Sequence, residues 1–328
     1  MYAKCGALTK AQEVLYELPV QNVVCWSALI SGYAQYGSGE EALCCFQQMQ
    51  RERLSPNAIT FACALKACGI VQDVNAGERI RDEIVSQGLL KGDVVLGSAL
   101  VEMYAKCGVL VKAQTVLDEL LVWNVVCWSA LISGYAQHSC GKEALSCFRQ
   151  MRSEGLLADE VSWNALIGGF AQQGLAKEAL DCFRWMQQEG TPPTAVIFVS
   201  VLNACSHSGL VDEGQTLLDN MRDKYGIVPD NEHYTCMVDL FGRARQFDKA
   251  MGVIKLMPST NYLPVWSAVL GACQKWGDVE LGRLAFECAV EYKCDSAAYV
   301  LMRNIYAAAD MQEAQNVKSM RIRNGARS

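Results

Sequence analysis

The tract Val-Val-Cys-Trp-Ser-Ala-Leu-Ile-Ser-Gly-Tyr-Ala-Gln stands at residues 23–35 and again, unchanged, at residues 125–137. The copies are 102 residues apart, and Met-Tyr-Ala-Lys-Cys-Gly recurs with the same offset, at 1–6 and 103–108. Stacked units that each bury one face against a neighbour produce such copies, whereas an enzyme with a single core does not require them. The chain is therefore expected to be a repeat protein.

A shorter period lies inside the longer one, because Ser129–Gln137 reappears in altered form at Asn164–Gln172, 35 residues later. Each unit reads as helix, turn, helix: the uncharged tract 23–35 precedes Tyr-Gly-Ser-Gly, and residues 40–51 then carry apolar side chains at helical spacing. Pro56 ends this second helix, since the residue before proline avoids the helical region. The sequence predicts an all-α fold, an α-solenoid superhelix of tandem helix-turn-helix repeats.

The same spacing divides the chain into consecutive units. They are expected at 1–22 (partial), 23–57, 58–93, 94–124, 125–159, 160–194, 195–230 and 231–262, followed by an extension at 263–328. The complete units are 35, 36, 31, 35, 35, 36 and 32 residues long. About three units are needed before a solenoid buries a continuous core, so this number is sufficient.

Composition excludes several classes of protein. Hydrophobic residues make up 51% and charged residues 20%, which is typical of a folded chain, and the net charge of −6 does not favour nucleic-acid binding by the whole surface, although a local groove stays open. No apolar run reaches the roughly 20 residues of a membrane span, so no membrane association is expected. The sixteen cysteines include no C-x-x-C pair. Those at 44, 45, 147 and 182 are expected to be buried as small apolar side chains.

The unit lengths and two tracts carry a resemblance to a known family. Units of 35, 36 and 31 residues, with Met-Tyr-Ala-Lys-Cys-Gly and with Ala-Cys-Ser-His-Ser-Gly-Leu-Val-Asp-Glu-Gly at 204–214, resemble the pentatricopeptide repeat (PPR) family and its plant PLS subclass. The resemblance implies the following types: P at 23–57 and 125–159, L at 58–93, S at 94–124, P-like at 160–194, L-type at 195–230, S-type at 231–262, and a partial S-type at 1–22. Residues 265–273 and 299–309 resemble the E extension of that subclass, here expected to be truncated.

The resemblance implies one RNA nucleotide per repeat, recognised by the side chains at the fifth and last positions. Donor and acceptor groups there would match the edge of a base. The pairs, with the base each implies, are Ser27 with Asn57 (A), Ser98 with Asn124 (A), Ser129 with Asp159 (G) and Asn164 with Thr194 (a pyrimidine). The pairs that imply any base are Ala62 with Asp93, Val199 with Asp230 and Thr235 with Tyr262. The expected target is single-stranded 5′-A-n-A-G-Y-n-n-3′.

Two further positions are candidates for RNA contact. The second position of six repeats carries a stiff β-branched side chain suited to sandwiching a base, with ordinary helix packing as the alternative: Val24, Ile59, Val95, Val126, Val161 and Val196. The thirteenth position carries Lys4, Lys106 and Arg243, which are expected on the RNA backbone, with a solvated surface charge as the alternative.

No catalytic chemistry is expected from the chain itself. A deaminase domain would require H-x-E and C-x-x-C zinc ligands, and neither motif occurs. The histidines at 138, 207 and 233 are expected in core or surface roles, and Trp26, Trp128 and Trp163 in packing between repeats. The sequence predicts a protein that is not an enzyme and has no cofactor, metal or small-molecule substrate.

The E extension implies that a DYW-type cytidine deaminase, or another editing factor, is supplied in trans for C-to-U editing of organellar RNA. Mitochondrion or chloroplast is implied by the family, with a transit peptide expected ahead of this chain. Two alternatives stay open. One is a protein-binding helical scaffold of the tetratricopeptide sort, whose period is 34 residues, and the other is a truncated, inactive fragment of a longer PPR protein. A nuclease or hydrolase built on the solenoid lacks support, since no carboxylates cluster at metal-ligand spacing.

Overall fold

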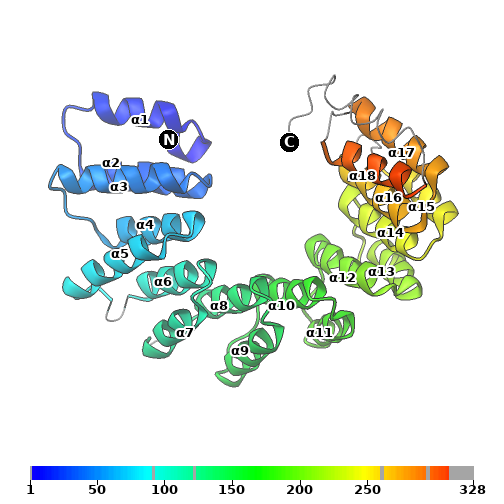
Figure 1. Cartoon of the computed structure of the whole chain (residues 1–328). Coiled ribbons are helices and arrows are strands. Elements are labelled where there is room, and N and C mark those ends of the chain that lie inside the picture. Colours follow the sequence, from blue (N-terminus) through cyan, green and yellow to red (C-terminus); the bar gives the residue numbers. More distant parts are fainter. Residues whose placement is uncertain (1, 91–92, 121–122, 259–261, 293–295, 310–328) are drawn as a thin grey trace. The chain divides into compact units, whose positions relative to one another are not determined.

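A computed structural model describes residues 2–90, 93–120, 123–258, 262–292 and 296–309 (Figure 1). Every regular element in these ranges is a helix, which confirms the all-α prediction. Helical hairpins follow a short 3-10 helix at Tyr2–Cys5 and helix α1 at Leu8–Glu17, and α18 at Ser296–Ala308 comes last.

Each hairpin has a first and a second helix. The first helices are α2 (Val23–Gln35), α4 (Ala58–Val71), α6 (Val94–Lys106), α8 (Val125–Gln137), α10 (Glu160–Gln172), α12 (Ala195–Ser208), α14 (Asn231–Arg243) and α16 (Leu263–Trp276). The second helices are α3 (Gly39–Arg51), α5 (Val74–Ser86), α7 (Leu110–Glu119), α9 (Gly141–Ser153), α11 (Ala176–Gln188), α13 (Val211–Asp223), α15 (Phe247–Ile254) and α17 (Val279–Tyr292).

The hairpins form two compact parts, residues 1–169 and residues 170–328, with the boundary inside α10. In the first part α2, α4, α6 and α8 follow one another, each in contact with the next (Figure 1). In the second part α12 contacts α14, and α14 contacts α16. No helix of the described ranges combines the length and the apolar character that crossing a bilayer requires.

Several first helices begin at side chains that cap them. The Asn22 side chain accepts hydrogen bonds from the backbone N–H groups of Val24 and Cys25, and Asn124 accepts one from Cys127 at 2.8 Å. An N-cap of this kind satisfies N–H groups that have no partner inside the helix. The asparagine ahead of each of these two apolar runs therefore sets where the helix starts.

The first helices are apolar because neighbours cover them on several sides. Helix α6 contacts the first helices before and after it as well as its own partner α7. In α2 the side chains of Trp26, Leu29, Ile30 and Tyr33 are all buried. A helix enclosed in this way has little polar face, which accounts for the absence of charge in the tract 23–35.

The second helices are amphipathic, so the face on which a cysteine lies decides whether it is buried or exposed. Helix α3 buries Cys45, Phe46 and Met49, while Cys44 points to solvent and is exposed. The expectation that Cys44 is buried is therefore wrong, whereas the thiols at 45, 147 and 182 are buried as predicted. Burial is the main cause that raises the pKa of the Cys45 thiol to about 11. Every cysteine in the described ranges is a free thiol.

Aromatic side chains join successive hairpins. Trp26, Trp128 and Trp163 are fully buried. The ring of Trp163 lies 4.5 Å from that of Phe148 in the preceding hairpin, measured between centroids. The prediction that these tryptophans pack between repeats is confirmed. Truncating such a side chain to alanine typically costs about 3–5 kcal/mol, so each is a major contributor to stability.

A glycine allows two first helices to approach closely. A Cβ atom on Gly134 of α8 would lie 2.6 Å from the Cβ and 3.1 Å from the Cα of Ala105 in α6. Because the second of these atoms belongs to the backbone, a side chain at 134 would force the helices apart. The small residue at this position therefore sets the spacing between neighbouring repeats.

Candidate functional site

The second positions of the repeats form a series of exposed apolar side chains. Each is between 55% and 67% exposed and begins a first helix: Val24, Ile59, Val95, Val126, Val161 and Val196. Ordinary helix packing, the alternative raised by the sequence, would bury these side chains. Their exposure leaves them available to a ligand.

One cavity of about 350 Å³ brings several of the predicted site residues together. It lies between α6, α8 and the start of α10, and its lining includes Val126 and Val161 from successive second positions. Ser129 and Asp159, the fifth and last residues of the repeat 125–159, line it as well, and Lys106 contributes a positive charge. The cavity thus combines two apolar side chains, two hydrogen-bonding groups and a cation, and Glu102 also lines it as a second acidic side chain beside Asp159.

A network of short hydrogen bonds holds the polar groups of this cavity. The hydroxyl of Ser129 donates to the Val125 carbonyl at 2.7 Å, and its oxygen is 2.7 Å from the hydroxyl oxygen of Ser162. Ser162 donates to Asp159 Oδ1 through its hydroxyl at 2.6 Å and its backbone N–H at 2.8 Å. Among the described residues all hydrogen bonds to this carboxylate end on Oδ1, which leaves Oδ2 as an acceptor.

The repeat 23–57 has the same network with an amide at its end. The hydroxyl of Ser27 donates to the Val23 carbonyl at 2.7 Å and shares a 2.6 Å hydrogen bond with the hydroxyl of Thr60. Thr60 donates to Asn57 Oδ1 through both its hydroxyl and its N–H group, at 2.9 Å. Because Oδ1 is occupied by the cap, the amide nitrogen of Asn57 is the atom that can face outward.

The repeat 94–124 builds a looser version. Ser98 donates to the Val94 carbonyl at 2.7 Å, and its oxygen is 2.9 Å from the thiol sulfur of Cys127. A thiol is a weak hydrogen-bonding group. Asn124 Oδ1 accepts only the backbone N–H of Cys127 among the bonds described.

Sequence reasoning missed the residues that join these pairs. Thr60, Cys127 and Ser162 are each the third residue of a repeat, and each contacts the fifth-position serine of the preceding repeat. Three different residue types at one position do not form a recognisable motif. What the three positions share is a small hydroxyl or thiol side chain three residues after the N-cap residue of the helix.

In the repeat 195–230, where Val199 stands at the fifth position, a histidine takes the place of both hydroxyls. His233 is fully buried, its Nε2 lies 2.9 Å from the Ala195 carbonyl, and its Nδ1 lies 2.6 Å from Asp230 Oδ1. Burial opposes ionisation of Asp230, but hydrogen bonds from His233 outweigh it and hold the pKa of the carboxyl below its usual value. His233 thus links the carbonyl of Ala195, the first residue of the repeat, to the side chain of Asp230, its last residue. No hydroxyl at the fifth position takes part.

Two of the three predicted phosphate-binding cations, Lys106 and Arg243, are paired with acids. Lys106 Nζ lies 2.7 Å from Glu102 Oε1, and Arg243 Nε lies 2.7 Å from Asp239 Oδ2, each one helical turn away. These ion pairs reduce the positive charge offered to a ligand. The side chain of Lys4 lies outside the described part of the chain.

The predicted pair Asn164 and Thr194 is divided between the two parts. Asn164 lies on α10 within the first part, and Thr194 precedes α12 in the second part. Both side chains are half-buried.

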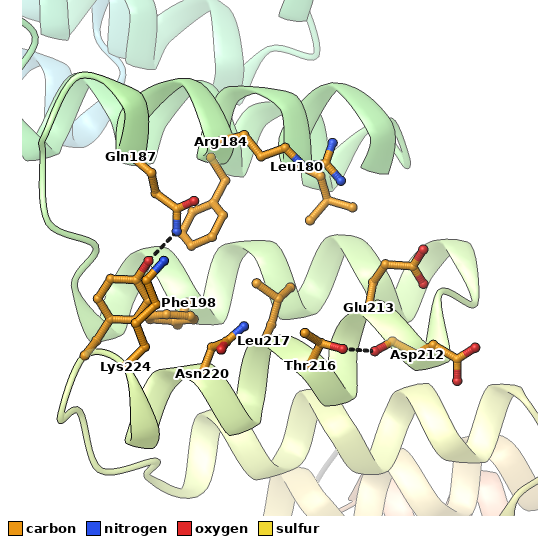
Figure 2. Close-up of a pocket in the computed structure, with 12 residues that line it drawn as sticks. Leu180, Arg184, Gln187, Phe198, Asp212, Glu213, Thr216, Leu217, Asn220 and Lys224 are labelled. Carbon is orange, nitrogen blue, oxygen red and sulfur yellow. Dashed lines mark hydrogen bonds between the residues drawn. The ribbon is translucent and has the colours of Figure 1, made fainter.

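A second cavity, of about 400 Å³, lies on the side of the second helices and contains none of the predicted site residues. It opens between α11 and α13, over Phe198 of α12 (Figure 2). The Gln187 amide donates to the Tyr225 hydroxyl at 2.6 Å beside it. Within the described ranges, no group of three or more His, Cys, Asp or Glu side chains is arranged to hold a metal ion.

Stacked hairpins with first helices in mutual contact and capped starts define a helical-repeat protein of the α-solenoid class. Family models match within this framework: the PPR repeat family at residues 21–69 and 158–207, and the PPR repeat at 126–156, 196–225 and 232–261. The chain belongs to the pentatricopeptide repeat family.

Relatives from Arabidopsis thaliana match almost the whole chain. The chloroplastic protein CRR2 is 38% identical over 98% of this chain and 44% of its own length. The chloroplastic protein DOT4 is 36% identical over 99% of this chain and 33% of its own length. A putative mitochondrial pentatricopeptide repeat-containing protein is 33% identical over 95% of this chain and 45% of its own length. The chain therefore spans less than half the length of these three relatives.

Solved structures confirm the fold. The pentatricopeptide repeat protein PPR10 in complex with an 18-nt psaJ RNA element superimposes with a TM-score of 0.75 at 18% identity, over 94% of this chain and 46% of that protein. The structure of PPR10 from maize gives a TM-score of 0.58 at 19% identity, over 100% of this chain and 48% of that protein.

Proposed function

We propose that the chain binds single-stranded RNA and reads one nucleotide per repeat, with the preferred sequence 5′-A-n-A-G-Y-n-n-3′. The observation that carries this proposal is the cavity of about 350 Å³, in which two exposed valines stand beside Ser129, Asp159 and Lys106. Apolar faces suit the flat surface of a base, and the polar pair suits its edge. Complex formation between PPR10 and an RNA element supports the same function for this chain.

The repeats that would each take one nucleotide are 23–57, 58–93, 94–124, 125–159, 160–194, 195–230 and 231–262. This division is supported by the first helices, each of which starts at the first residue of such a repeat. The assignment of P, L and S types to them, and thus of the chain to the PLS subclass, belongs to the proposal.

The capping geometry supports the proposed preference for adenine or guanine. Asn57 turns its Oδ1 to the helix, so its amide nitrogen donates toward the base, whereas Asp159 offers the acceptor Oδ2. Adenine presents an acceptor at N1, and guanine presents a donor there. An outward amide therefore matches adenine, and an outward carboxylate oxygen matches guanine.

We further propose that the protein acts in organellar RNA metabolism as a site-recognition factor for C-to-U editing, with the deaminase supplied in trans. The chloroplastic and mitochondrial names of relatives support an organelle. Support for editing comes from the sequence at 265–273 and 299–309, which resembles an E extension. Residues 310–328 of that proposed extension lie outside the described residues.

Binding of the purified chain to 5′-A-C-A-G-C-C-C-3′, compared with the RNA carrying G at both A positions, tests the reading. Each mismatch leaves polar groups facing like groups, at a cost of about 1–3 kcal/mol. The double replacement should then weaken binding by at least about 30-fold at fixed salt. Equal affinity for both RNAs would refute sequence-specific reading.

Sequencing of organellar transcripts after loss of the gene tests the editing role. A C-to-U site downstream of a sequence that fits the proposed target should lose its edited form. If every organellar C-to-U site remained edited, the role in editing would be wrong, while RNA binding could still hold.

A further inference from the structure

In three places the third residue of the following repeat contacts the fifth-position serine that is proposed to read a base. Thr60 and Ser162 are both fully buried, yet each has a hydroxyl that joins the two proposed readers of the preceding repeat. A hydroxyl in an apolar core is unfavourable without partners, and here it has two. These side chains are therefore placed to control the groups beside them.

The first effect concerns the single hydroxyl proton of the serine. For Ser27, the acceptors within reach are the Val23 carbonyl at 2.7 Å and the Thr60 oxygen at 2.6 Å, and both belong to the protein. For Ser129 they are the Val125 carbonyl, the Ser162 oxygen and Asp159 Oδ1. In the network of Ser27 the proton therefore stays inside, so the Ser27 oxygen is left to accept a hydrogen bond from a base.

The second effect concerns the last residue of the repeat. The Thr60 hydroxyl and N–H group both donate to Asn57 Oδ1, and this pair of bonds fixes which end of the amide faces the helix. The backbone bond already favours this orientation, because the flipped amide would place its NH2 group against the Thr60 N–H. The hydroxyl adds a second constraint that keeps the amide nitrogen outward.

We propose that Thr60 and Ser162 are positioning residues for base recognition: Thr60 holds Ser27 as an acceptor and Asn57 with its amide nitrogen outward, and Ser162 holds Asp159 with Oδ2 outward. This inference rests on the proposed RNA reading. The pattern of an accepting serine oxygen and a donating amide nitrogen matches the N6 amino group and N1 of adenine. Guanine has the acceptor O6 and the donor N1–H at those places. It would therefore place acceptor against acceptor at the serine and donor against donor at the amide.

The repeat 94–124 provides an internal comparison. Its third-position partner is Cys127, whose thiol lies 2.9 Å from the Ser98 oxygen and makes no described bond to Asn124. Since the thiol is the weaker group, selectivity for A at the third nucleotide should be lower than at the first. Restoring a hydroxyl at residue 127 should raise it.

The test measures the ratio of affinities for A and G at the first nucleotide of 5′-A-C-A-G-C-C-C-3′, in the full chain. Thr60→Val removes the hydroxyl and keeps the shape, and should lower this ratio about 3- to 10-fold, as expected for one lost hydrogen bond. Thr60→Ser keeps the hydroxyl and should retain the ratio. Selectivity at the fourth nucleotide, read by another repeat, should stay unchanged in both variants.

A second variant, Cys127→Thr, should increase selectivity. It is expected to raise the ratio of affinities for A and G at the third nucleotide about 3- to 10-fold. A purely structural role for these residues would change the melting temperature or the affinity for every RNA, and would leave the ratios unaltered. If the unmodified chain discriminates but Thr60→Val discriminates equally well, or if Thr60→Ser loses selectivity as Thr60→Val does, the inference is wrong. If the unmodified chain does not discriminate, the proposed function itself fails.

Discussion

Replacing Asp159 with asparagine should change the preferred base of one repeat while leaving the fold intact. The carboxylate uses Oδ1 to cap α10, through the N–H and the hydroxyl of Ser162 at 2.8 and 2.6 Å. Asparagine can make both bonds with its own Oδ1. The outward atom then changes from an oxygen that accepts to a nitrogen that donates.

The size of the effect follows from that single atom. Against guanine, the variant places donor against donor, and an unsatisfied polar group costs about 1–3 kcal/mol. Against adenine, the variant gains a hydrogen bond where the native carboxylate faced another acceptor. Its affinity for the RNA with A should therefore rise by a comparable free energy. The preference for G over A at the fourth nucleotide should therefore shift toward A by at least about 2 kcal/mol, or about 30-fold.

Fluorescence anisotropy with two RNAs, A or G at the fourth nucleotide, measures this ratio. The ratio removes the general gain in affinity that follows loss of a negative charge near the RNA backbone. Asp93→Asn is the matched control, because Asp93 also caps a first helix but its repeat has Ala62 at the fifth position. It should leave the ratio of affinities for G and A at the fourth nucleotide close to that of the unmodified chain.

Stability provides the second readout for Asp159→Asn. Aspartate and asparagine are about equally good N-caps, so the free energy of unfolding should change by less than about 0.5 kcal/mol. A folded variant that still prefers G would refute the reading role assigned to Asp159. A variant that loses stability together with affinity for every RNA would show that the residue only caps the helix.

Three further outcomes are expected. Gly134→Ala should lower the free energy of unfolding by about 1–3 kcal/mol in urea titrations, since its Cβ would meet the backbone of Ala105; an unchanged midpoint would contradict the close helix contact. A maleimide at about pH 8 should label Cys44 in the native protein and Cys45 only after unfolding, because burial raises the pKa of the second thiol to about 11; equal labelling rates in mass spectrometry would argue against the orientation of α3. Lys106→Gln should reduce the slope of log K against log salt by about 0.7 with base preference unchanged, and an unaltered slope would exclude phosphate contact.

Much of the architecture could be read from the sequence because its signals are local. The polar residue at 57 and the proline before it mark a helix boundary by themselves. The exposure of Cys44 could also have been found, since Cys45, Phe46 and Met49 already define the buried face of α3 and leave residue 44 on the other side. The error came from treating adjacent cysteines as equivalent.

The contacts within the candidate site were harder to foresee. The bond between Ser27 and Thr60 joins residues 33 positions apart and depends on how two first helices are rotated against each other. No periodicity in the chain reports that rotation. The pairing of Lys106 with Glu102, by contrast, has the i, i+4 spacing with the acid ahead of the base, and this was visible in the sequence.

Helices α2 and α8 have identical sequences, yet the repeats to which they belong end in different residues, Asn57 and Asp159. Both residue types start a helix about equally well, and a single-nucleotide change can convert an asparagine codon into an aspartate codon. On the proposed reading, a duplicated repeat can therefore acquire a new RNA target through a mutation that selection for folding does not detect. Gene duplication followed by drift at this position provides a neutral route by which one ancestral array can diversify its targets.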